Sequence, residues 1–587
     1  MRKQQQQAPE PAKIWLFDES MLDRPSSSAV ATYDVYKDVM HSTDAIRPGG
    51  AIPLLSRASL GLLAQYAAVG VVYGLLPRLD YPVYFNYLNF TGTQIASYNA
   101  LLGICWTLKV FLGILTDCFP IFRYRRRSYM VLGWTITFVA CLVMTLTPFP
   151  APFLAPELNE MLHDDDRRQV RAGNFTSLNA TLLALVHEEA SHSATLWIFL
   201  SVVASLGYLI ADVAADAMVV QYAHREPMAI RGRMQSVTFG VRFAASILPQ
   251  AIFGFCLNGK VYGGTFDWSI SPNVAYGVLL APCLWAIAAA MFWVDEDAAD
   301  RVALMSYMHQ LWDLLKLRVV WQICAFRFFS NLFFGFDSTA AMPIMSKWAK
   351  VAPLVQSWYT ILTSLLMSAA VFGCGKWGLQ WDWRRTIAIT TVAVVVIDAT
   401  MVFGVTWNLF RDPYIYVGGL LSDTIPGGIR WIIAAYCAVE IADMGNEGVV
   451  NALVTSIVNM SDPFAVFLYK VIDSYFDKLD LQDDTTEVRW QVSATYIIAF
   501  AMKLLSLGFL VFLPSQKAAV QLLKRKGGAS HRAAVLLVTG FAIALLFSLT
   551  TCIMALVPST SCYRIAGGDG NPIVEGNVTI CGTRATT

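Results

Sequence analysis

The sequence has few charged residues, and this shortage excludes most soluble classes of protein. Only 14% of its 587 residues are Asp, Glu, Lys or Arg, whereas 56% are hydrophobic. A soluble domain typically has about 25% charged residues. The formal net charge is +1, which is not the surplus of cations that a nucleic-acid-binding protein uses to displace counterions. The composition therefore indicates a membrane protein and argues against a nucleic-acid partner.

The motifs of common catalytic and cofactor sites are also missing. The chain has no Gly-x4-Gly-Lys-Ser/Thr nucleotide loop, no Cys-x-x-Cys pair and no cluster with the spacing of a metal site or an activated nucleophile. We therefore predict that the protein is not an enzyme and holds neither a cofactor nor a metal ion. Most of the eleven cysteines lie in apolar runs. Cys562 and Cys581 differ because they flank a polar tail, where they could form a disulfide in an oxidising compartment.

Long apolar segments dominate the rest of the chain. From Ala58 onward each is about 20 residues long, the length that an α-helix needs to cross a bilayer core of about 30 Å. We predict two groups of six spans, followed by a thirteenth span over residues 533–557. The first twelve cover residues 58–79, 94–116, 128–149, 195–220, 234–256, 273–294, 320–345, 355–375, 386–407, 429–444, 449–472 and 490–512.

Polar segments between the spans divide the chain into parts and orient it in the membrane. Lys and Arg gather in the loops on the side of the N-terminus, which is the bias of cytoplasmic loops. Four glycosylation sequons agree, because their asparagines fall on the other side: Asn89, Asn174, Asn179 and Asn577. We expect an integral membrane protein of the plasma membrane or an endomembrane, with a cytosolic N-terminus. The predicted parts are a cytosolic disordered leader (1–56), an N-terminal six-helix bundle (57–294), a cytosolic linker (295–319), a C-terminal six-helix bundle (320–513), a basic cytosolic linker (514–532), a thirteenth helix (533–557) and an extracytosolic tail (558–587).

The connection between the second and third spans carries the most informative motif. Gly113 and Asp117 stand at the end of one helix, and a basic cluster with Arg125 and Arg126 precedes the next. Gly113 permits close helix approach, and Asp117 can pair with either arginine in one conformation and release it in another. We interpret this stretch as a gating loop. A copy with the same spacing, residues 373–385, lacks the acid and indicates two repeated halves.

This stretch and two others resemble the folate-biopterin transporter family of the major facilitator superfamily. The resemblance implies an all-α membrane protein with two six-helix bundles, here with an extra C-terminal transmembrane helix. It covers roughly residues 58–513, and it is looser in the second half, where Ser461-Asp462-Pro463 replaces a pattern of small residues. The matching stretches are Trp106-Thr-Leu-Lys109 with Asp117, Pro120-Ile and Tyr124-Arg-Arg; Ala211-Asp212 to Asp216-Ala217 with Gly232, Gln235, Ser236, Gly240 and Arg242; and Glu440 to Gly448 with Asn459.

Charged residues inside the spans are costly and either function or pair structurally. Counting about 1.5 Å per residue from the cytoplasmic ends places Lys109, Asp212 and Arg242 roughly 10–12 Å deep. Asp216 shares a helical face with Asp212, and Trp106 precedes Lys109 by one turn. In the functional interpretation, Lys109 and Arg242 hold an anionic substrate while an aspartate carries a coupling proton. The alternative is a structural brace between spans two, four and five.

The second half offers weaker candidates for the substrate site. Asp462, in the eleventh span, is the acid that we most expect to face a cavity. Asp398 and Lys503 lie on spans that are peripheral in this superfamily, so we expect a structural pair there. The other secondary candidates are Arg327, Asp337 and Glu440.

The resemblance implies a secondary active transporter that moves folate- or pterin-type solutes by alternating access. Its partners would be a small-molecule substrate, a coupling proton and the lipid bilayer. A second hypothesis keeps the fold but changes the solute, for example to S-adenosylmethionine, whose cationic groups would favour Asp212 and Asp216. A third hypothesis is a transporter-like receptor that moves nothing, although the intact gating loop argues against it.

Overall fold

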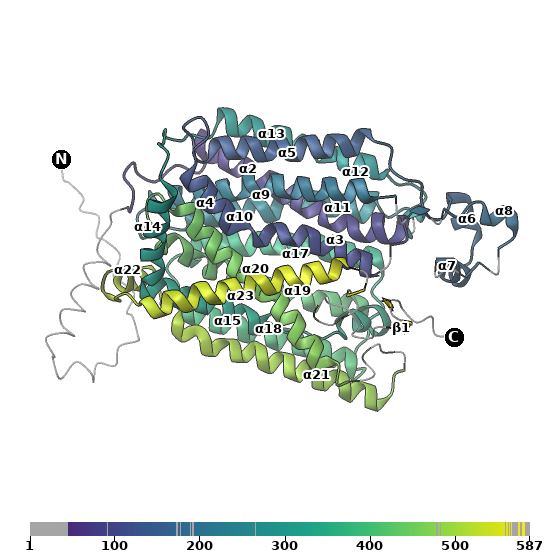
Figure 1. Cartoon of the computed structure of the whole chain (residues 1–587). Helices are drawn as coiled ribbons and strands as arrows, with labels where there is room; N and C mark the ends of the chain where they lie inside the picture. The colour runs from purple at the N-terminus through teal and green to yellow at the C-terminus, as the bar shows by residue number, and fades with distance from the viewer. Residues whose placement is uncertain are drawn as a thin grey trace, which may run out of the picture.

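The computed structural model describes residues 45–580, except 91, 172–173, 176–177, 188, 191–192, 265, 477–478, 480, 482, 558, 561–562, 564, 566–572 and 576–577. In this part of the chain, long helices lie side by side along one axis of the molecule (Figure 1). Most of the predicted leader lies outside the described residues, as do Cys562, Asn577 and Cys581.

Each predicted span of the first half coincides with a helical segment. Ser56 begins the first of them by accepting a hydrogen bond from the backbone N–H of Ser59, as an N-cap residue does. The segments are α2 (Arg57–Leu75) with η2 (Pro77–Asp80) and η3 (Tyr81–Tyr87), α3 (Gly92–Thr107) with α4 (Lys109–Cys118), α5 (Arg127–Leu146), α9 (Thr195–His224), α10 (Arg233–Ala245) with α11 (Ile247–Ala251) and η5 (Ile252–Cys256), and α12 (Pro272–Val278) with α13 (Leu280–Phe292).

Four of these segments are interrupted: Pro77 follows the break after α2, and prolines account for two of the other three breaks. Pro249 and Pro282 have no N–H to donate to the preceding turn, and the helices break just before them, at Ser246 and Leu279. The third break, at Leu108, has no proline beside it and divides a span that we predicted as one helix. It places Lys109 at the first position of α4.

The second half repeats the pattern of long, partly interrupted helices. Asp412 and Ser530 begin two of them by accepting hydrogen bonds from backbone N–H groups of the first turn. The segments are α15 (Arg318–Phe334), α16 (Ala341–Pro343) with η7 (Ile344–Trp348), α17 (Pro353–Gly373) with η8 (Cys374–Gly378), α18 (Trp383–Thr406), α19 (Pro413–Ile441), α20 (Glu447–Asp473), α21 (Thr486–Leu505) with η9 (Ser506–Phe512), and α23 (His531–Leu556).

Two predicted spans have the wrong bounds. The seventh ends at Phe334 instead of continuing to residue 345, and the chain is not helical again until α16. The tenth, predicted over 429–444, is a helix of 29 residues, Pro413–Ile441. Its first half contains Asp423 and Pro426. Because an acid and a proline are uncommon in a membrane span, the sequence did not indicate a span there. A helix inside a bundle tolerates such residues because its neighbours satisfy the freed backbone groups.

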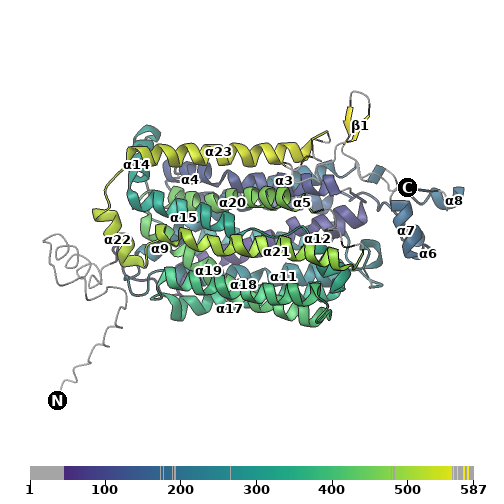
Figure 2. The same cartoon turned by 90° about the horizontal axis from the view of Figure 1, so that it is seen from below.

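Eleven helical segments of the described residues are long and apolar enough to cross a membrane. The segments α15 and α19 are not among them, and α15 has only 17 residues. Both nevertheless lie among the other long helices (Figure 2). The thirteenth predicted span is α23, which is one of the eleven.

Shorter elements gather at the two ends of the helices (Figures 1 and 2). The linker helix α14 and the basic helix α22 lie at one end, together with Arg47, whose backbone N–H donates to the carbonyl of His224. The long 151–194 loop lies at the opposite end. The elements are α14 (Leu304–Lys316) and α22 (Lys517–Lys526) at the first end, and α6 (Pro156–Met161), α7 (Asp164–Arg171), α8 (Ala180–Leu183), η6 (Lys260–Tyr262) and the hairpin β1 (Ile573–Glu575) and β2 (Val578–Ile580) at the second.

The two halves pack directly against each other near the α14 end. There α4 meets the start of α20, and a Cβ added to Gly113 would lie 2.9 Å from the carbonyl oxygen of Gly448. On the opposite side, α10 packs against α17. The helix α23 lies outside both bundles, along α3 and α20 (Figures 1 and 2). Its Phe547 stacks on Phe464 of α20, with the ring centroids 4.0 Å apart.

Candidate functional site

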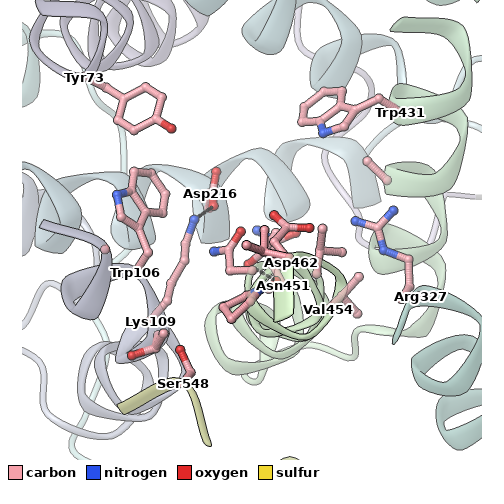
Figure 3. A pocket seen from close by; sticks show the side chains of 18 of the residues that line it. Tyr73, Trp106, Lys109, Asp216, Arg327, Trp431, Asn451, Val454, Asp462 and Ser548 are labelled. Atoms are coloured by element: carbon pink, nitrogen blue, oxygen red, sulfur yellow. Dashed lines mark hydrogen bonds and ion pairs between the residues drawn. The ribbon is translucent and has the colours of Figure 1, made fainter. Parts of the chain in front are cut away.

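A cavity of about 940 Å³ lies between the two halves. The first half lines it with residues of α2, α3, α4, α9 and α10, and the second half with residues of α15, α17, α19 and α20. The helix α23 adds Ser548, Thr551 and Cys552 to the wall. Figure 3 shows Trp106, Lys109 and Asp216 on one side of this cavity.

Four charged side chains of the first half form one connected layer at the cavity. Lys109 Nζ lies 2.8 Å from an oxygen of Asp212 and 2.6 Å from an oxygen of Asp216. Arg242 Nη1 lies 3.2 Å from the other oxygen of Asp212. The hydroxyl of Tyr66 donates to Asp216 over 2.5 Å. We call Lys109, Asp212, Asp216 and Arg242 the charge layer, and its two cations balance its two carboxylates.

Three helices hold the charge layer in place. Asp212 and Asp216 are one turn apart on α9 and are almost completely buried, at 0% and 3% exposure. Helix α10 brings Arg242 close because Gly70 of α2 packs directly on its backbone, where an added Cβ would lie 2.3 Å from the carbonyl oxygen of residue 242. The break at Leu108 places Lys109 opposite the two acids. The structure thus brings together the residues that the sequence grouped, and their role in binding stays a prediction.

Aromatic rings cover the cavity side of the charge layer. The Trp106 ring centroid lies 5.3 Å from Lys109 Nζ and 5.6 Å from Arg242 Cζ. Tyr73 lies 5.5 Å from the same Arg242 atom. These are cation–π distances. The predicted substrate-binding residue Trp106 is therefore part of the same wall, and its ring can present a flat face to a bound solute.

The second half builds the opposite wall with different chemistry. Figure 3 shows Arg327 and Trp431 across the cavity from Lys109. Asp462, on α20, lies between Lys109 and Arg327 in this view. Arg327 lines the cavity although it is only 5% exposed, and Asp462 is exposed to it. Neither side chain forms a hydrogen bond or ion pair with another of the described residues. Two of the secondary candidates therefore lie at the cavity.

A second charged cluster closes the α14 end between the halves. Asp117, at the end of α4, accepts hydrogen bonds from Arg126 over 2.5 Å, from the Tyr307 hydroxyl over 2.7 Å and from the backbone N–H of Val449 over 2.9 Å. Arg126 also lies 3.6 Å from Glu447. Val449 is in the first turn of α20, so Asp117 satisfies a free N–H of that helix from across the interface. We call Asp117, Arg126, Tyr307, Glu447 and Val449 the gate cluster.

Of the two arginines that we predicted as possible partners of Asp117, only Arg126 forms the contact. Arg125 does not pair with Asp117 but turns to the linker between the halves. Its backbone N–H donates to Glu296 over 2.8 Å, and its guanidinium donates to the carbonyl of Asp300 over 3.1 Å. The reason is that the chain reverses tightly before Arg125, so adjacent side chains of the basic cluster point to different partners. Arg126 alone reaches Asp117.

The other two secondary candidates lie away from the cavity wall. Glu440 pairs with Arg231 over 3.1 Å and accepts a hydrogen bond from Gln521 of α22 over 2.6 Å. Asp337 lies in the non-helical stretch after α15, where its carboxylate accepts the N–H of Ser338. Neither residue lines the cavity. Glu440 lies in the last turn of α19, and Asp337 follows the end of α15.

The expected structural pair of the second half forms as proposed. Lys503 Nζ lies 3.2 Å from a carboxylate oxygen of Asp398. Each side chain is 14% exposed, and neither lines the cavity between the halves.

The described sequons differ in accessibility. Asn174 and Asn179 are exposed in the 151–194 loop. Asn89 is half-buried, and its side-chain nitrogen donates to the carbonyl of Arg171 over 3.0 Å. That nitrogen is the atom to which a glycan would be attached, so Asn89 is a poorer acceptor than the other two.

Sequence reasoning missed several residues of these clusters. Tyr66 and Tyr307 could not be singled out from the sequence, because a single tyrosine in a span or a linker belongs to no recognisable pattern. Trp431 lies in the span whose bounds were wrong. Glu447 lies within a stretch that matched the family pattern, and its contact with Arg126 joins two such stretches that are distant in sequence.

The motifs and the fold both have counterparts among known proteins. A family model described as the BT1 family matches residues 70–152. A curated protein from Synechocystis sp., named folate-biopterin transporter, is 21% identical over 499 residues, which covers 79% of this chain and 83% of that protein. The resemblance to the folate-biopterin transporter family is thereby confirmed.

Solved structures of transporters share the fold. A D-xylose–proton symporter superposes with a TM-score of 0.51 at 13% identity, over 78% of this chain and 98% of the other. A double-tryptophan mutant of XylE gives a TM-score of 0.53 at 12% identity, over 81% of this chain and 98% of the other. The likeness confirms an all-α fold of the major-facilitator type. The family and these structural neighbours are transporters rather than enzymes.

Proposed function

We propose that the chain is an integral membrane transporter of the BT1 and major-facilitator type that moves folate- or pterin-type solutes by alternating access. The observation that carries this proposal is the cavity between the halves, which has room for such a solute. Its first-half wall combines an indole face with a lysine and an arginine. A flat heteroaromatic ring can stack on Trp106 while an anionic group approaches the two cations.

Proton coupling follows from the charge balance of the layer. Lys109 is shared between Asp212 and Asp216, so both of its strong interactions are already satisfied by the protein. Protonation of Asp216 removes one negative charge and leaves the layer with a net positive charge. An anionic solute then binds more favourably, and by linkage its binding favours the protonated state. Proton and anion thus bind together.

Alternating access requires that the gate cluster opens. In this structure Asp117 and Arg126 hold α4 against the start of α20. In the proposed cycle these contacts break and the cavity opens toward the α14 end. The bundles then rock about the cavity, as in other transporters built from repeats. Ligand binding promotes the change only to the extent that it favours one of the two states.

The direct test of the substrate class is uptake competition in proteoliposomes that contain the full chain. We expect unlabelled folic acid and biopterin to reduce the uptake of labelled folic acid, and an inward proton gradient to accelerate that uptake. Competition by S-adenosylmethionine alone would favour the second hypothesis, in which Asp212 and Asp216 face a cationic solute. A protein that takes up none of the three would be better described as a receptor.

We also propose that the α14 end is cytosolic, in the plasma membrane or an endomembrane. The basic loops support this orientation, as do Asn174 and Asn179 in the loop at the other end. In sealed vesicles of known orientation, protease should cleave the 295–319 linker and the 151–194 loop from opposite faces. Cleavage of both from the same face would contradict the topology. Glycans are expected on Asn174 and Asn179 in preference to Asn89.

A further inference from the structure

The second-half wall of the cavity contains a positive charge that the protein does not neutralise. Arg327, on α15, is 5% exposed, and its Nε is buried without a hydrogen-bond partner. No acid of the described residues lies within ion-pair distance of its guanidinium. A buried charge without a partner is costly inside a membrane protein. Something outside the described chain is therefore expected to compensate it.

A second arginine increases the positive charge at the same place. Arg430, on α19, is 6% exposed, and its guanidinium donates to the carbonyl and hydroxyl oxygens of Ser330 and to the hydroxyl of Thr391. Ser330 is three residues after Arg327 on α15, so the two guanidinium groups reach neighbouring turns of one helix. All the described partners of Arg430 are neutral, which leaves this region positive.

A free carboxylate lies on the same side of the cavity. Asp462, on α20, faces the cavity and forms no ion pair with another described residue. Pro463 follows it, and the stretch from residue 461 to 463 is where the chain departs from the family pattern. Arg327 and Asp462 thus offer a cation and an anion to one occupant, whereas the charge layer opposite is balanced within itself.

We propose that Arg327 and Asp462 bind the two ends of one solute, Arg327 a carboxylate and Asp462 an edge of adjacent N–H donors. This inference rests on the proposed function and names the form of its substrate. A guanidinium can bind a carboxylate through two parallel hydrogen bonds. The amino group and the neighbouring ring N–H of a pterin lie side by side in the same way, so a carboxylate accepts from both. The site therefore selects a pterin that carries a carboxylate over one that lacks it.

The second-half wall also supplies a surface for the ring itself. Trp431 lines the cavity, and its ring packs edge-on against Phe239 and Phe243 of α10, with centroids 4.9 and 5.4 Å away. These contacts join the two halves and fix the orientation of the indole. A ring bound by Asp462 would lie between Trp431 and Trp106, which face the cavity from opposite halves (Figure 3). Closure of the halves would then bring both indoles onto the solute.

The test measures binding of three compounds to the purified full chain by thermal-shift titration. Folic acid has both the ring and the carboxylates, biopterin has the ring alone, and p-aminobenzoylglutamate has the carboxylates alone. Arg327→Gln should weaken folic acid and p-aminobenzoylglutamate about tenfold, which is the loss expected for a hydrogen bond to a charged group. Binding of biopterin should stay within about twofold. Asp462→Asn should weaken folic acid and biopterin and spare p-aminobenzoylglutamate.

Matched controls separate these losses from general damage. Arg123→Gln and Asp313→Asn make the same chemical changes at exposed positions, where the side chains are 74% and 70% accessible, and should change no affinity. Arg327→Lys keeps the charge and should recover part of the folic acid affinity, which keeps the test decisive if Arg327→Gln does not fold.

The possible outcomes distinguish this inference from the proposed function. If the unaltered chain binds the pterins but each variant weakens all three compounds equally, or none of them, the inference is overturned and the proposed function stands. If the unaltered chain binds none of the three compounds, the proposed substrate class fails and this inference fails with it.

Discussion

The charge layer and the gate cluster contain similar residues but differ in which parts of the chain they join. Every member of the charge layer belongs to the first half, on α4, α9 and α10. The gate cluster joins α4 to the linker helix α14 and to α20 of the second half. If the halves move as rigid bodies, the first cluster stays intact during transport and the second must break. Both clusters contain buried charged residues, so burial alone does not distinguish the role of the charge layer from that of the gate cluster.

The largest effect is expected from substitutions in the charge layer, which stays intact during transport. Lys109→Ala and Arg242→Ala should each abolish folic acid uptake, because they remove the cations that face the solute and leave an acid unpaired. Loss of one partner of a buried ion pair costs roughly 3–5 kcal/mol, so thermal stability should fall as well. Lys109→Arg should recover only part of the uptake, since a guanidinium fork does not replace a compact ammonium group. Uptake and melting temperature are measured on the same preparations.

A double change distinguishes the substrate site from a structural brace. Arg242→Ala combined with Asp212→Ala leaves one cation, Lys109, and one acid, Asp216. Stability should therefore recover toward that of the unaltered chain. If uptake recovers fully as well, the charge layer is only a brace, and our assignment of the substrate site is wrong. Recovery of stability without uptake supports the assignment.

The residues of the charge layer could be predicted from the sequence. Charged residues inside apolar spans are rare enough to be recognised singly, and helix counting placed Lys109, Asp212 and Arg242 at one depth. The partners of Asp117 in the gate cluster could not be predicted in the same way. The choice of Arg126 over Arg125 depends on the direction of a tight turn, and the contact of Asp117 with Val449 joins residues more than three hundred positions apart. The bounds of α19 were also wrong, because tertiary packing allowed a proline and an acid within the helix.

Substitutions in the gate cluster should change the rate of uptake rather than the affinity for folic acid. Asp117→Asn keeps an oxygen for the N–H of Val449 but removes the charge that binds Arg126. A charge-assisted hydrogen bond contributes about 1.5–3 kcal/mol, so we expect uptake to slow about tenfold or more. Folic acid affinity should change less than about twofold, because Asp117 does not line the cavity.

The control for Asp117→Asn is Asp300→Asn, which makes the same change at a side chain that is 95% accessible. It should alter neither rate nor affinity. Loss of binding by a folded Asp117→Asn protein would contradict the division between the two clusters, since it would place Asp117 in the substrate site.

A smaller effect should follow from a change of shape without a change of charge. A methyl group at Gly113 would lie 2.9 Å from the backbone of α20, whereas Gly103, in the same predicted span, has no atom within 4 Å. Gly113→Ala should therefore separate α4 from α20, slow uptake several-fold and increase the labelling of a cysteine placed at the α14 end of the cavity. Gly103 lines the cavity, so Gly103→Ala is a control for the labelling alone, which it should not increase. Equal labelling in the two variants would mean that the close contact does not seal this end.

The smallest expected effect concerns an uncharged contact of α23, the helix that lies along both halves. Helix α23 lies along α3 of the first half and α20 of the second, and its Phe547 stacks on Phe464. Because an aromatic pair contributes about 0.5–1.5 kcal/mol beyond its burial, Phe547→Ala should loosen α23 without unfolding the bundles. Uptake should then accelerate about twofold at unchanged affinity, since the two helices move apart more easily. Leu546→Ala, at a neighbouring side chain that is 64% exposed, should leave the rate unchanged. A lower affinity in Phe547→Ala would instead assign α23 to the substrate site, through Ser548 and Thr551 in the cavity wall.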